Sequence, residues 1–364
     1  MKRLICMLML VGILLCACNA APVETNAPTT TEATTEATTE ATTKATTVPT
    51  EPPVLYRHPL TGAPLEEPFT GRVTAVVINN IKAALPQYGI TGADIFYELE
   101  TEGGITRCLG LFTDLESVGT IGPIRSARTY FNNIAASYDA PVIHCGGSDK
   151  ALAGMYDESG YVDNWEHINE QSNGKYFFRD YNRYNNQGYN WEHTLFTEGE
   201  KLLVGLADKE MNTVNEEGTD FGLLFDEHVV PEGTDAKEIT VEFRGDKTTE
   251  FTYEEETGLY KARQYGSTFI DAGNNQQLAV NNLLVIHAEQ TSRNTGYTVR
   301  SYYDMVGSGN GYFATAGKIV SIKWIRENIE DPFSYTSADG TPVTLNVGKT
   351  YVGVIDLSAN VFFE

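Results

Sequence analysis

Two short alternating segments separated by a pair of glycines place the strongest constraint on how this chain can fold. Residues 94–100 alternate between apolar and polar side chains, and residues 106–112 form a second segment of strand-forming types. Between them, Glu102-Gly103-Gly104 supplies the conformational freedom that a tight turn needs. The pattern predicts a β-hairpin. Its first strand would direct Ile95, Tyr97 and Leu99 to one face and Phe96, Glu98 and Glu100 to the other.

Apolar segments on either side of the hairpin predict the rest of a first domain. Residues 73–78 are a nearly continuous β-branched run, and residues 141–145 form a second one, so both are expected to be buried strands. Apolar residues recur at helical spacing over residues 127–138, and Ser126 is the predicted N-cap of that helix. A capping-box pattern at residues 197–200 predicts a further helix that ends near Glu210.

The second half of the chain is predicted to contain strands only. Alternating segments separated by turn residues continue to the end of the sequence, and residues 337–342 carry a strong hairpin-turn signal. We therefore predict an α+β protein with a layered α/β N-terminal domain around a mixed sheet, followed by an antiparallel β-rich C-terminal domain. The expected boundaries are 54–212 for the first domain, 213–236 for a linker and 237–364 for the second domain.

The first 53 residues have the features of an exported, lipid-anchored protein. A positive start precedes an apolar run that is too short to span a membrane, and Leu15-Cys16-Ala17-Cys18 resembles a bacterial lipobox. This predicts a signal peptide over residues 1–17 and diacylglycerol on Cys18; an ordinary signal peptide or an uncleaved anchor is the alternative. Residues 18–53 are rich in Thr, Glu, Ala and Pro, which predicts a disordered spacer. The domains would then lie on the extracytoplasmic face of the cell membrane.

Charge and cysteine content exclude several functional classes. The chain has 26 Lys and Arg against 49 Asp and Glu, a net charge of −23, which disfavours binding to nucleic acid. Of its five cysteines, only Cys108 and Cys145 remain outside the signal peptide and the lipidation site. They could form one disulfide or stay as two buried thiols. No CxxC motif is present, and neither a cofactor nor a metal is expected.

The strongest site candidate is a group of charged residues near the hairpin. Arg125 and Arg128 lie at the start of the predicted helix, where cations oppose the helix dipole, so they need acidic partners or a bound anion. One interpretation is an internal ion-pair network. The others are ligand binding, with guanidinium groups on a phosphate or carboxylate, and catalysis by the two glutamates as acid and base. The group consists of Glu98, Glu102, Arg107, Arg125 and Arg128.

Two further motifs are weaker candidates. His144-Cys145-Gly146-Gly147-Ser148 follows a predicted strand, where backbone N–H groups could hold an anion, although a simple turn with Ser148 as a helix cap explains it equally. A hydrolase that uses His144 with a serine lacks the expected elbow motif. The tetrapeptide Asn-Trp-Glu-His occurs at residues 164–167 and 190–193, where metal binding, aromatic platforms for a glycan and ordinary packing are the alternatives.

Several of these motifs together resemble the YerB-like lipoprotein family of Gram-positive bacteria, which has no established activity. The resemblance covers most of residues 57–357 and departs from the family pattern at Cys108, at Cys145 and in an apparent insertion over residues 184–192. It implies an α+β N-terminal domain and a β-rich C-terminal domain. The motifs that carry it are His58-Pro59-Leu60-Thr61-Gly62, Glu102-Gly103-Gly104-Ile105-Thr106-Arg107, Arg125-Ser126-Ala127-Arg128, Phe178-Arg179-Asp180, Arg183, His193-Thr194-Leu195 and Gly348-Lys349-Thr350.

These observations favour a non-enzymatic module that binds a cell-wall glycan, a peptide or an envelope protein. The alternative is a cell-wall hydrolase with Glu98 or Glu102 as acid and base, for which His144 is a weak further candidate. The binding residues that we predict are Glu102, Gly103, Gly104, Arg107, Arg125, Ser126, Arg128, His144, Gly146, Gly147, Ser148, Arg179, Asp180, Arg183 and His193.

Overall fold

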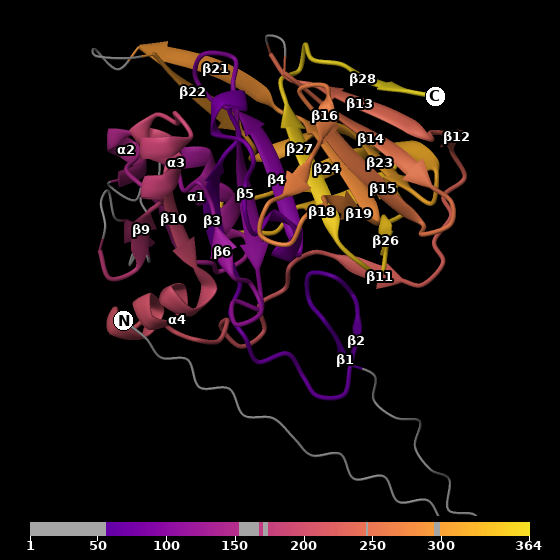
Figure 1. Cartoon of the computed structure of the whole chain (residues 1–364). Helices are drawn as coiled ribbons and strands as arrows, with labels where there is room; N and C mark the ends of the chain where they lie inside the picture. Colours follow the sequence, from indigo (N-terminus) through magenta and orange to yellow (C-terminus); the bar gives the residue numbers. More distant parts are fainter. Residues whose placement is uncertain (1–55, 153–166, 170–173, 245–246, 295–298) are drawn as a thin grey trace, which may run out of the picture. The chain divides into compact units, whose positions relative to one another are not determined.

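The computed structural model describes residues 56–152, 167–169, 174–244, 247–294 and 299–364 (Figure 1). The predicted signal peptide, the lipidation site Cys18 and the spacer lie outside the described residues, as do the first three residues of the motif at 164–167. Residues 53–364 form one compact unit. Within the described part of the chain, no helix has both the length and the apolar character needed to cross a membrane.

One eleven-stranded mixed sheet runs through both halves of the sequence. Its central strands are nearly fully buried, as the continuous apolar runs predict. In sheet order the strands are β12 (Thr234–Asp235), β24 (Lys318–Arg326), β23 (Gly307–Thr315), β20 (Asn282–His287), β27 (Thr350–Ile355), β4 (Ile95–Glu100), β5 (Thr106–Phe112), β3 (Thr74–Asn79), β7 (Val142–His144) and β8 (His167–Asn169), with β25 (Ser334–Ser337) beside β24.

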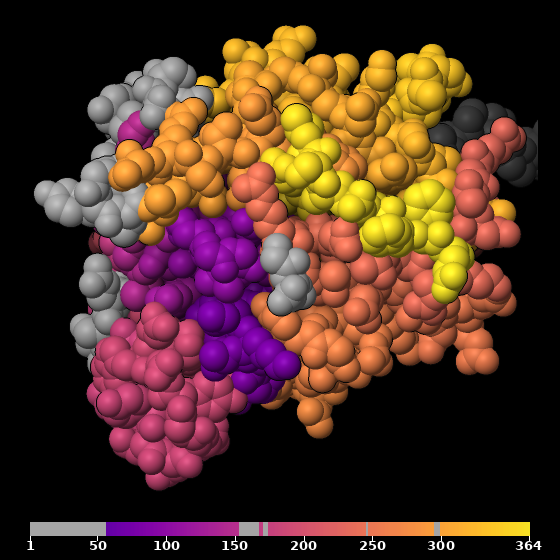
Figure 2. Space-filling view, turned by 90° about the horizontal axis from the view of Figure 1, so that it is seen from above, coloured from indigo at the N-terminus to yellow at the C-terminus, as the bar shows by residue number. Residues whose placement is uncertain are grey.

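The predicted hairpin is present, and it lies in the middle of this sheet. Strands β4 and β5 pair in antiparallel fashion, with Leu99 opposite Arg107. On its other side, β4 pairs in parallel with β27 from the end of the chain, so the two halves share one sheet (Figure 1). Strand β27 is also parallel to β20, which corrects the prediction of a purely antiparallel second half. Figure 2 shows the two halves as adjoining parts of one surface.

A second, six-stranded antiparallel sheet packs against one face of the large sheet. Aromatic pairs lie between the two layers: Phe96 lies 6.0 Å from Phe269, which follows β16, and Phe251 lies 4.7 Å from Tyr351, measured between ring centroids. Edge contacts of this kind add to the apolar area that the sheets bury between them. The strands of the second sheet are β16 (Ser267–Thr268), β15 (Leu259–Gln264), β14 (Thr248–Glu254), β13 (Glu238–Glu242), β28 (Val361–Phe363) and β19 (Ala279–Val280).

Helix α1 (Thr129–Ala136) covers the opposite face of the hairpin. Tyr130, Phe131 and Ile134 pack against residues of β3, β4 and β5, as the helical spacing predicts. Ser126 is not the N-cap, because hydrogen bonds to β3 and Gly146 hold residues 125–127 extended, and Arg128 is the residue before the helix. The described residues are mostly β. Their α-helices are four and short, so helices contribute less than the predicted layered α/β domain implies.

The capping box predicted at residues 197–200 is also absent. Thr197 lies in strand β10 (Leu195–Glu198), and its hydroxyl donates to the carbonyl of Tyr176 at 2.8 Å. Helix α4 (Gly199–Asp208) therefore begins after Glu198 without a side-chain cap. The remaining elements are β1 (Tyr56–Arg57), β2 (Pro64–Leu65), β6 (Thr120–Ile121), α2 (Asp149–Leu152), β9 (Phe177–Arg179), α3 (Tyr181–Asn186), β11 (Leu224–Asp226), β17 (Ile270–Asp271), β18 (Gln276–Gln277), β21 (Glu289–Asn294), β22 (Val299–Asp304), β26 (Thr344–Asn346) and the 3-10 helices Lys82–Ala84, Ile90–Gly92 and Trp191–His193.

Candidate functional site

Most of the predicted site residues gather at one edge of the large sheet. Strands β3, β7 and β8 are mutually parallel, and both β3 and β4 run antiparallel to β5. The carboxyl ends of four strands and the first residues of β5 therefore meet at the same edge, beside the start of α1. In sheets of this kind, ligands bind outside the carboxyl ends of the parallel strands.

Glu102 and Arg128 form a bidentate ion pair at this edge. Nε and one terminal nitrogen of Arg128 donate to the two carboxylate oxygens of Glu102 at 2.8 and 2.7 Å. The backbone N–H of Ser301 donates to the same carboxylate at 3.3 Å. Burial acts to raise the pKa of Glu102, but the hydrogen bonds and charge of Arg128 outweigh it, and the net pKa is lowered. The glutamate thus supplies the acidic partner that a cation at this helix end requires.

Arg107 lies beside this pair without a carboxylate of its own. Its side chain is buried, with 5% of its surface exposed, and one terminal nitrogen donates to the carbonyl of Ser126 at 2.8 Å. Its Nε is buried and has no hydrogen-bond partner among the described residues. Burial, and then the positive charge of Arg128, lower the pKa of Arg107 to about 9. A buried guanidinium with an unsatisfied donor is an unusual and costly arrangement.

Arg125 is the exposed member of the group. It pairs with Glu192 at 2.8 Å, and the two side chains are 22% and 51% exposed. Such surface pairs stabilise a protein by only about 0–1 kcal/mol, so the guanidinium can be redirected to another anion at little cost. The positive charge of Arg125 also contributes to the lowered pKa of Arg107. The positive charges of Arg125 and Arg128 therefore both act on Arg107 at this edge.

The glycine turn after β7 is held by internal hydrogen bonds. The N–H of Gly146 donates to the side chain of Asn169 at 2.8 Å, and Ser148 accepts from the N–H of Ala151 at 3.4 Å as a helix cap. His144 is fully buried, with Nδ1 2.8 Å from the carbonyl of Gly146 and Nε2 3.0 Å from His167. Burial lowers the pKa of His144 to about 4, so its imidazole is neutral at pH 7.

The other predicted binding residues join the edge to the loops around it. Arg183 is buried and donates to the carbonyls of Pro86 and His193 at 2.9 and 3.3 Å. Asp180 caps α3 by accepting from the N–H of Arg183 at 3.0 Å, and the guanidinium of Arg179 lies 4.6 Å from the ring of Trp191. His193 contacts the side chain of Asn79 at 3.0 Å. Each of these contacts fixes a loop against the sheet.

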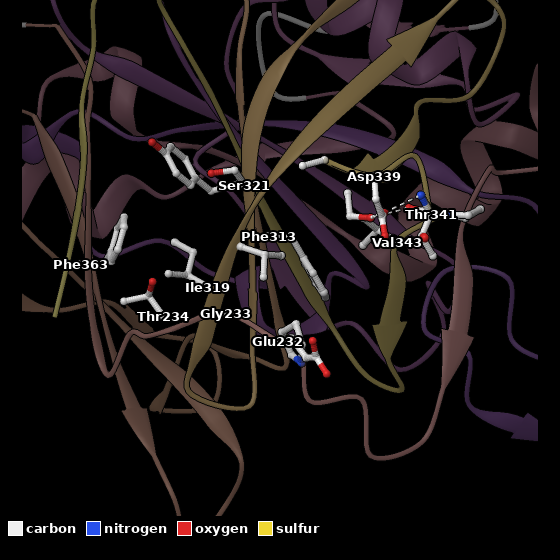
Figure 3. Close-up of a pocket in the computed structure, with 16 residues that line it drawn as sticks. Glu232, Gly233, Thr234, Phe313, Ile319, Ser321, Asp339, Thr341, Val343 and Phe363 are labelled. Atoms are coloured by element: carbon white, nitrogen blue, oxygen red, sulfur yellow. Dashed lines mark hydrogen bonds between the residues drawn. The ribbon is translucent and has the colours of Figure 1, made fainter.

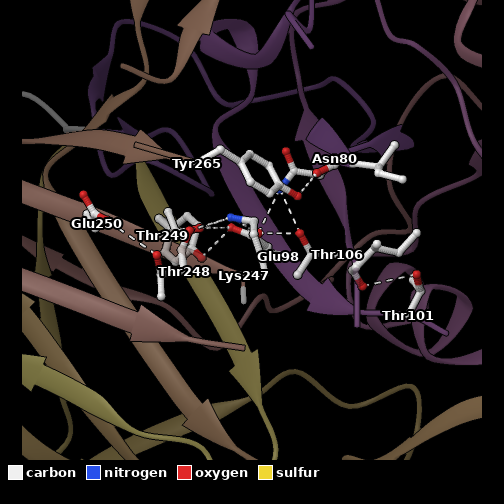
Figure 4. A network of polar contacts seen from close by, with 12 residues as sticks. Asn80, Glu98, Thr101, Thr106, Lys247, Thr248, Thr249, Glu250 and Tyr265 are labelled. Carbon is white, nitrogen blue, oxygen red and sulfur yellow. Dashed lines mark hydrogen bonds and ion pairs between the residues drawn. The ribbon is translucent and has the colours of Figure 1, made fainter. Parts of the chain in front are cut away.

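Glu98 does not belong to this group. It lies on the face of β4 that meets the second sheet, its side chain is fully buried, and both of its oxygens are hydrogen-bonded (Figure 4). Burial acts to raise its pKa, but Lys247 and the hydroxyl donors outweigh it, and the net pKa is lowered. The structure thus places Glu98 and Glu102 in two separate networks. The partners of Glu98 are Asn80, Thr106, Lys247, Thr249 and Tyr351.

Sequence reasoning missed two features of the second half. The partners of Glu98 from that half have no local sequence signal, since Thr249 lies 151 residues away along the chain. The second feature is a cavity of about 710 Å³, with Phe313, Ile319 and Ser321 on one side and the turn at Asp339 and Thr341 on the other (Figure 3). The complete lining is Pro231, Glu232, Gly233, Thr234, Tyr312, Phe313, Ile319, Val320, Ser321, Ser337, Ala338, Asp339, Thr341, Pro342, Val343 and Phe363.

The cysteines and the histidines offer no metal centre in the described part of the chain. Cys108 and Cys145 are both free thiols, the first buried and the second partly buried. No group of three or more His, Cys, Asp or Glu among the described residues is placed to hold a metal ion. Burial raises the pKa of the Cys108 thiol well above its ordinary value, which makes it a poor nucleophile.

Comparison with known proteins identifies the family. Residues 60–212 match the N-terminal domain, and residues 239–352 the C-terminal domain, of the family described as "Protein of unknown function (DUF3048)". The chain is 26% identical over 307 residues to "Putative lipoprotein YerB" of Bacillus subtilis (strain 168), which covers 83% of this chain and 87% of that protein. The crystal structure of the YerB protein from Bacillus subtilis matches with a TM-score of 0.70 and 25% identity, over 84% of this chain and 99% of the other. These matches confirm the resemblance drawn from the sequence motifs: the chain belongs to the DUF3048 family and is similar to YerB.

Proposed function

We propose that this protein is a membrane-anchored, extracytoplasmic lipoprotein that binds an anionic group of a cell-envelope ligand at the edge formed by Arg107, Arg125 and Arg128. One observation carries the proposal: Arg107 is buried with an unpartnered Nε, and the nearby guanidinium groups disfavour its charge further. Buried charges in folded proteins are normally paired. A carboxylate or phosphate of the ligand would supply the missing partner.

The three arginines would take different parts in binding. Arg128 is already held by Glu102, so it contributes a fixed positive charge. Arg107 offers the unsatisfied donor, and Arg125 can leave its exposed partner Glu192 to contact the ligand. Guanidinium groups bind carboxylate and phosphate oxygens through paired hydrogen bonds, which gives direction as well as affinity.

The ligand class follows from the charge of the whole chain. A net charge of −23 repels extended polyanions, whereas a single carboxylate or phosphate can reach a local group of arginines. Peptide stems and phosphorylated sugars of the cell wall carry such groups on otherwise polar backbones. The diacylglycerol predicted on Cys18 would keep the module within reach of them.

Thermal denaturation in the presence of ligands tests the proposal. Residues 54–364 would be heated with muropeptides, teichoic-acid fragments and phosphosugars in turn. A ligand at 100 times its Kd adds about 2.7 kcal/mol of stability and raises the melting temperature. Arg125→Gln should abolish this rise without lowering the melting temperature of the free protein, because its ion pair is exposed.

Arg263→Gln is the matched control. Arg263 is 45% exposed, its Nε lies 3.8 Å from Glu250, and the substitution removes the same charge from another part of the surface. The control should retain the ligand response in full. An unchanged melting temperature with every ligand, or an equal response in the two variants, would contradict the proposed site.

Cell-wall hydrolysis with Glu98 or Glu102 as acid and base stays the alternative prediction. Its test is product release from purified cell wall by the wild type and by Glu102→Gln. Release by the wild type alone would favour the hydrolase, and the absence of product from both would leave binding as the function.

A further inference from the structure

Glu98 contacts both Asn80 and Lys247 in the interior, and these three side chains have the functional groups needed for a reaction within the protein. It joins an amide, a carboxylate and an amine, and the three side chains are 0%, 0% and 2% exposed. Asn80 follows β3, Glu98 lies on β4, and Lys247 directly precedes β14 of the second sheet. Figure 4 shows Glu98 between Asn80 and Thr106 on one side and Lys247 and Thr249 on the other.

One oxygen of Glu98 touches both of the groups that would react. Its Oε1 accepts from Nδ2 of Asn80 at 2.8 Å and lies 2.9 Å from Nζ of Lys247. A carboxylate in this position can take a proton from an amine and deliver it to a departing amide nitrogen. Because both groups contact the same oxygen, the fold holds the nucleophile and the electrophile beside Glu98, which replaces an encounter in solution by a fixed arrangement.

The carbonyl of Asn80 is polarised from its other side. Nε2 of Gln87 donates to Oδ1 of Asn80 at 2.5 Å, and Gln87 is itself buried. A donor at this place stabilises the negative charge that develops on the oxygen when a nucleophile adds to the amide carbon. Around the amide of Asn80 the site therefore holds a nucleophile (Lys247), a proton carrier (Glu98) and a hydrogen-bond donor for the oxyanion (Gln87).

Three oxygen acceptors and two aromatic rings enclose the amine of Lys247. The ring centroids of Tyr265 and Phe243 lie 5.1 and 5.6 Å from Nζ of Lys247, and the hydroxyl of Tyr351 closes the other side of Glu98 at 2.9 Å. Transfer of one proton from the amine to the carboxylate converts an ion pair into two neutral groups without changing the net charge. Lys247 and the hydroxyl donors lower the pKa of Glu98, so the reaction begins from the ion pair and this transfer is its unfavourable first step.

We propose that Lys247 and Asn80 react to form an intramolecular amide bond that links the two sheets covalently. One proton of the Lys247 ammonium passes to Glu98, and the neutral Nζ adds to Cγ of Asn80. A second proton passes through Glu98 to Nδ2, the Cγ–Nδ2 bond breaks, and ammonia leaves. The new Nζ–Cγ amide forms with no oxidant or other reactant, and the remaining proton stays on Glu98. This inference does not depend on the anion site proposed above.

The proposed amide bond would cross-link the fold covalently, as disulfides do in many exported proteins. Both cysteines in the described residues are free, so no disulfide joins the sheets there. A bond from Asn80 to Lys247 would close a long loop of chain, and covalent closure of a loop stabilises the folded state by restricting the unfolded one.

Peptide mapping of the full-length protein, extracted from membranes, tests the proposal directly. Trypsin should release residues 73–82 joined to residues 245–261, with a mass one ammonia below the sum of the two peptides. Cleavage after Lys247 should be absent, because the linked side chain is no longer a lysine amine. Recovery of residues 73–82 alone, with cleavage after Lys247, would overturn the proposal whatever any variant does.

Variants assign the roles. Asn80→Ala and Lys247→Arg should each abolish the linked peptide, and Glu98→Gln should abolish it in protein that still shows folded far-ultraviolet circular dichroism. A linked peptide in folded Glu98→Gln would remove Glu98 from the reaction. Lys261 is the matched control, since it pairs with the partly exposed Glu254 and should be cleaved normally in every sample.

Discussion

Replacement of Arg107 by methionine should stabilise the free protein. The guanidinium is buried, and its pKa falls from 12.5 to about 9 because burial and the nearby Arg128 disfavour its charge. At 1.36 kcal/mol for each pKa unit, holding the charge at pH 7 costs up to about 5 kcal/mol. The hydrogen bond to Ser126 returns about 1.5–3 kcal/mol of that. Methionine fills a similar volume without charge, so we expect a net gain of about 1–4 kcal/mol.

Urea denaturation measures this gain as a higher midpoint with an unchanged slope. The sign of its pH dependence is fixed by the lowered pKa of Arg107. A base whose pKa is lowered by folding destabilises the protein fully below its folded pKa, and the penalty fades as pH rises above it. The advantage of Arg107→Met should therefore be constant up to about pH 9 and shrink above it.

Arg72→Met is the matched control, because the side chain of Arg72 is only 6% exposed but pairs with Asp139 at 2.9 Å. Removing one member of a buried ion pair costs about 3–5 kcal/mol, so this variant should lose stability. If Arg107→Met lost as much as Arg72→Met, the charge of Arg107 would be compensated within the protein. The argument for an anion at this edge would then fail.

Three further predictions concern the same edge of the sheet and the cysteines beside it. Arg128→Ala should cost about 3 kcal/mol in urea denaturation, because it leaves the carboxylate of Glu102 partly buried without its partner; a loss below about 1 kcal/mol would contradict the contribution of the pair. Folding lowers the pKa of His144 from 6.5 to about 4, so the unfolded chain binds the extra proton between these values. Its contribution to stability is complete above pH 6.5 and falls by up to about 3 kcal/mol as pH drops to 4, and His144→Gln should lack this dependence. Iodoacetamide should label partly exposed Cys145 before buried Cys108, which should react only on unfolding; mass spectrometry of labelled peptides would reveal the opposite order.

Local patterns predicted the central strands and the main helix, because their causes lie within the segments themselves. The alternation over residues 94–100 and the glycine pair after Glu102 are sufficient for a hairpin, and β4 and β5 follow it closely. The predicted cap at Ser126 is wrong because its segment is held by hydrogen bonds to β3 and Gly146, which are distant in sequence. Tertiary contacts of this kind leave no local signal.

The same reason explains which part of the candidate site could be predicted. Arg128 and Glu102 were correctly placed in one group, because the helix start and the hairpin turn both lie at the strand ends. The sequence also predicts Glu98 in this group, as a charged residue near the hairpin turn. However, β4 ends at Glu100, so Glu102 belongs to the turn while Glu98 faces the second sheet. Its partner Lys247 could not be inferred, because nothing near residue 247 indicates which buried acid it meets.

The parallel pairing of β4 with β27 has a consequence for the order of folding. A chain is synthesised from its N-terminus, so the hairpin is complete long before residues 350–355, which complete its sheet. During that interval, the outer edge of β4 presents unpaired N–H and C=O groups of an apolar strand. The large sheet in the first half is therefore complete only after β27, near the end of the sequence, has paired with β4. We expect a chain that ends before Thr350 to aggregate, and not to fold its first half independently.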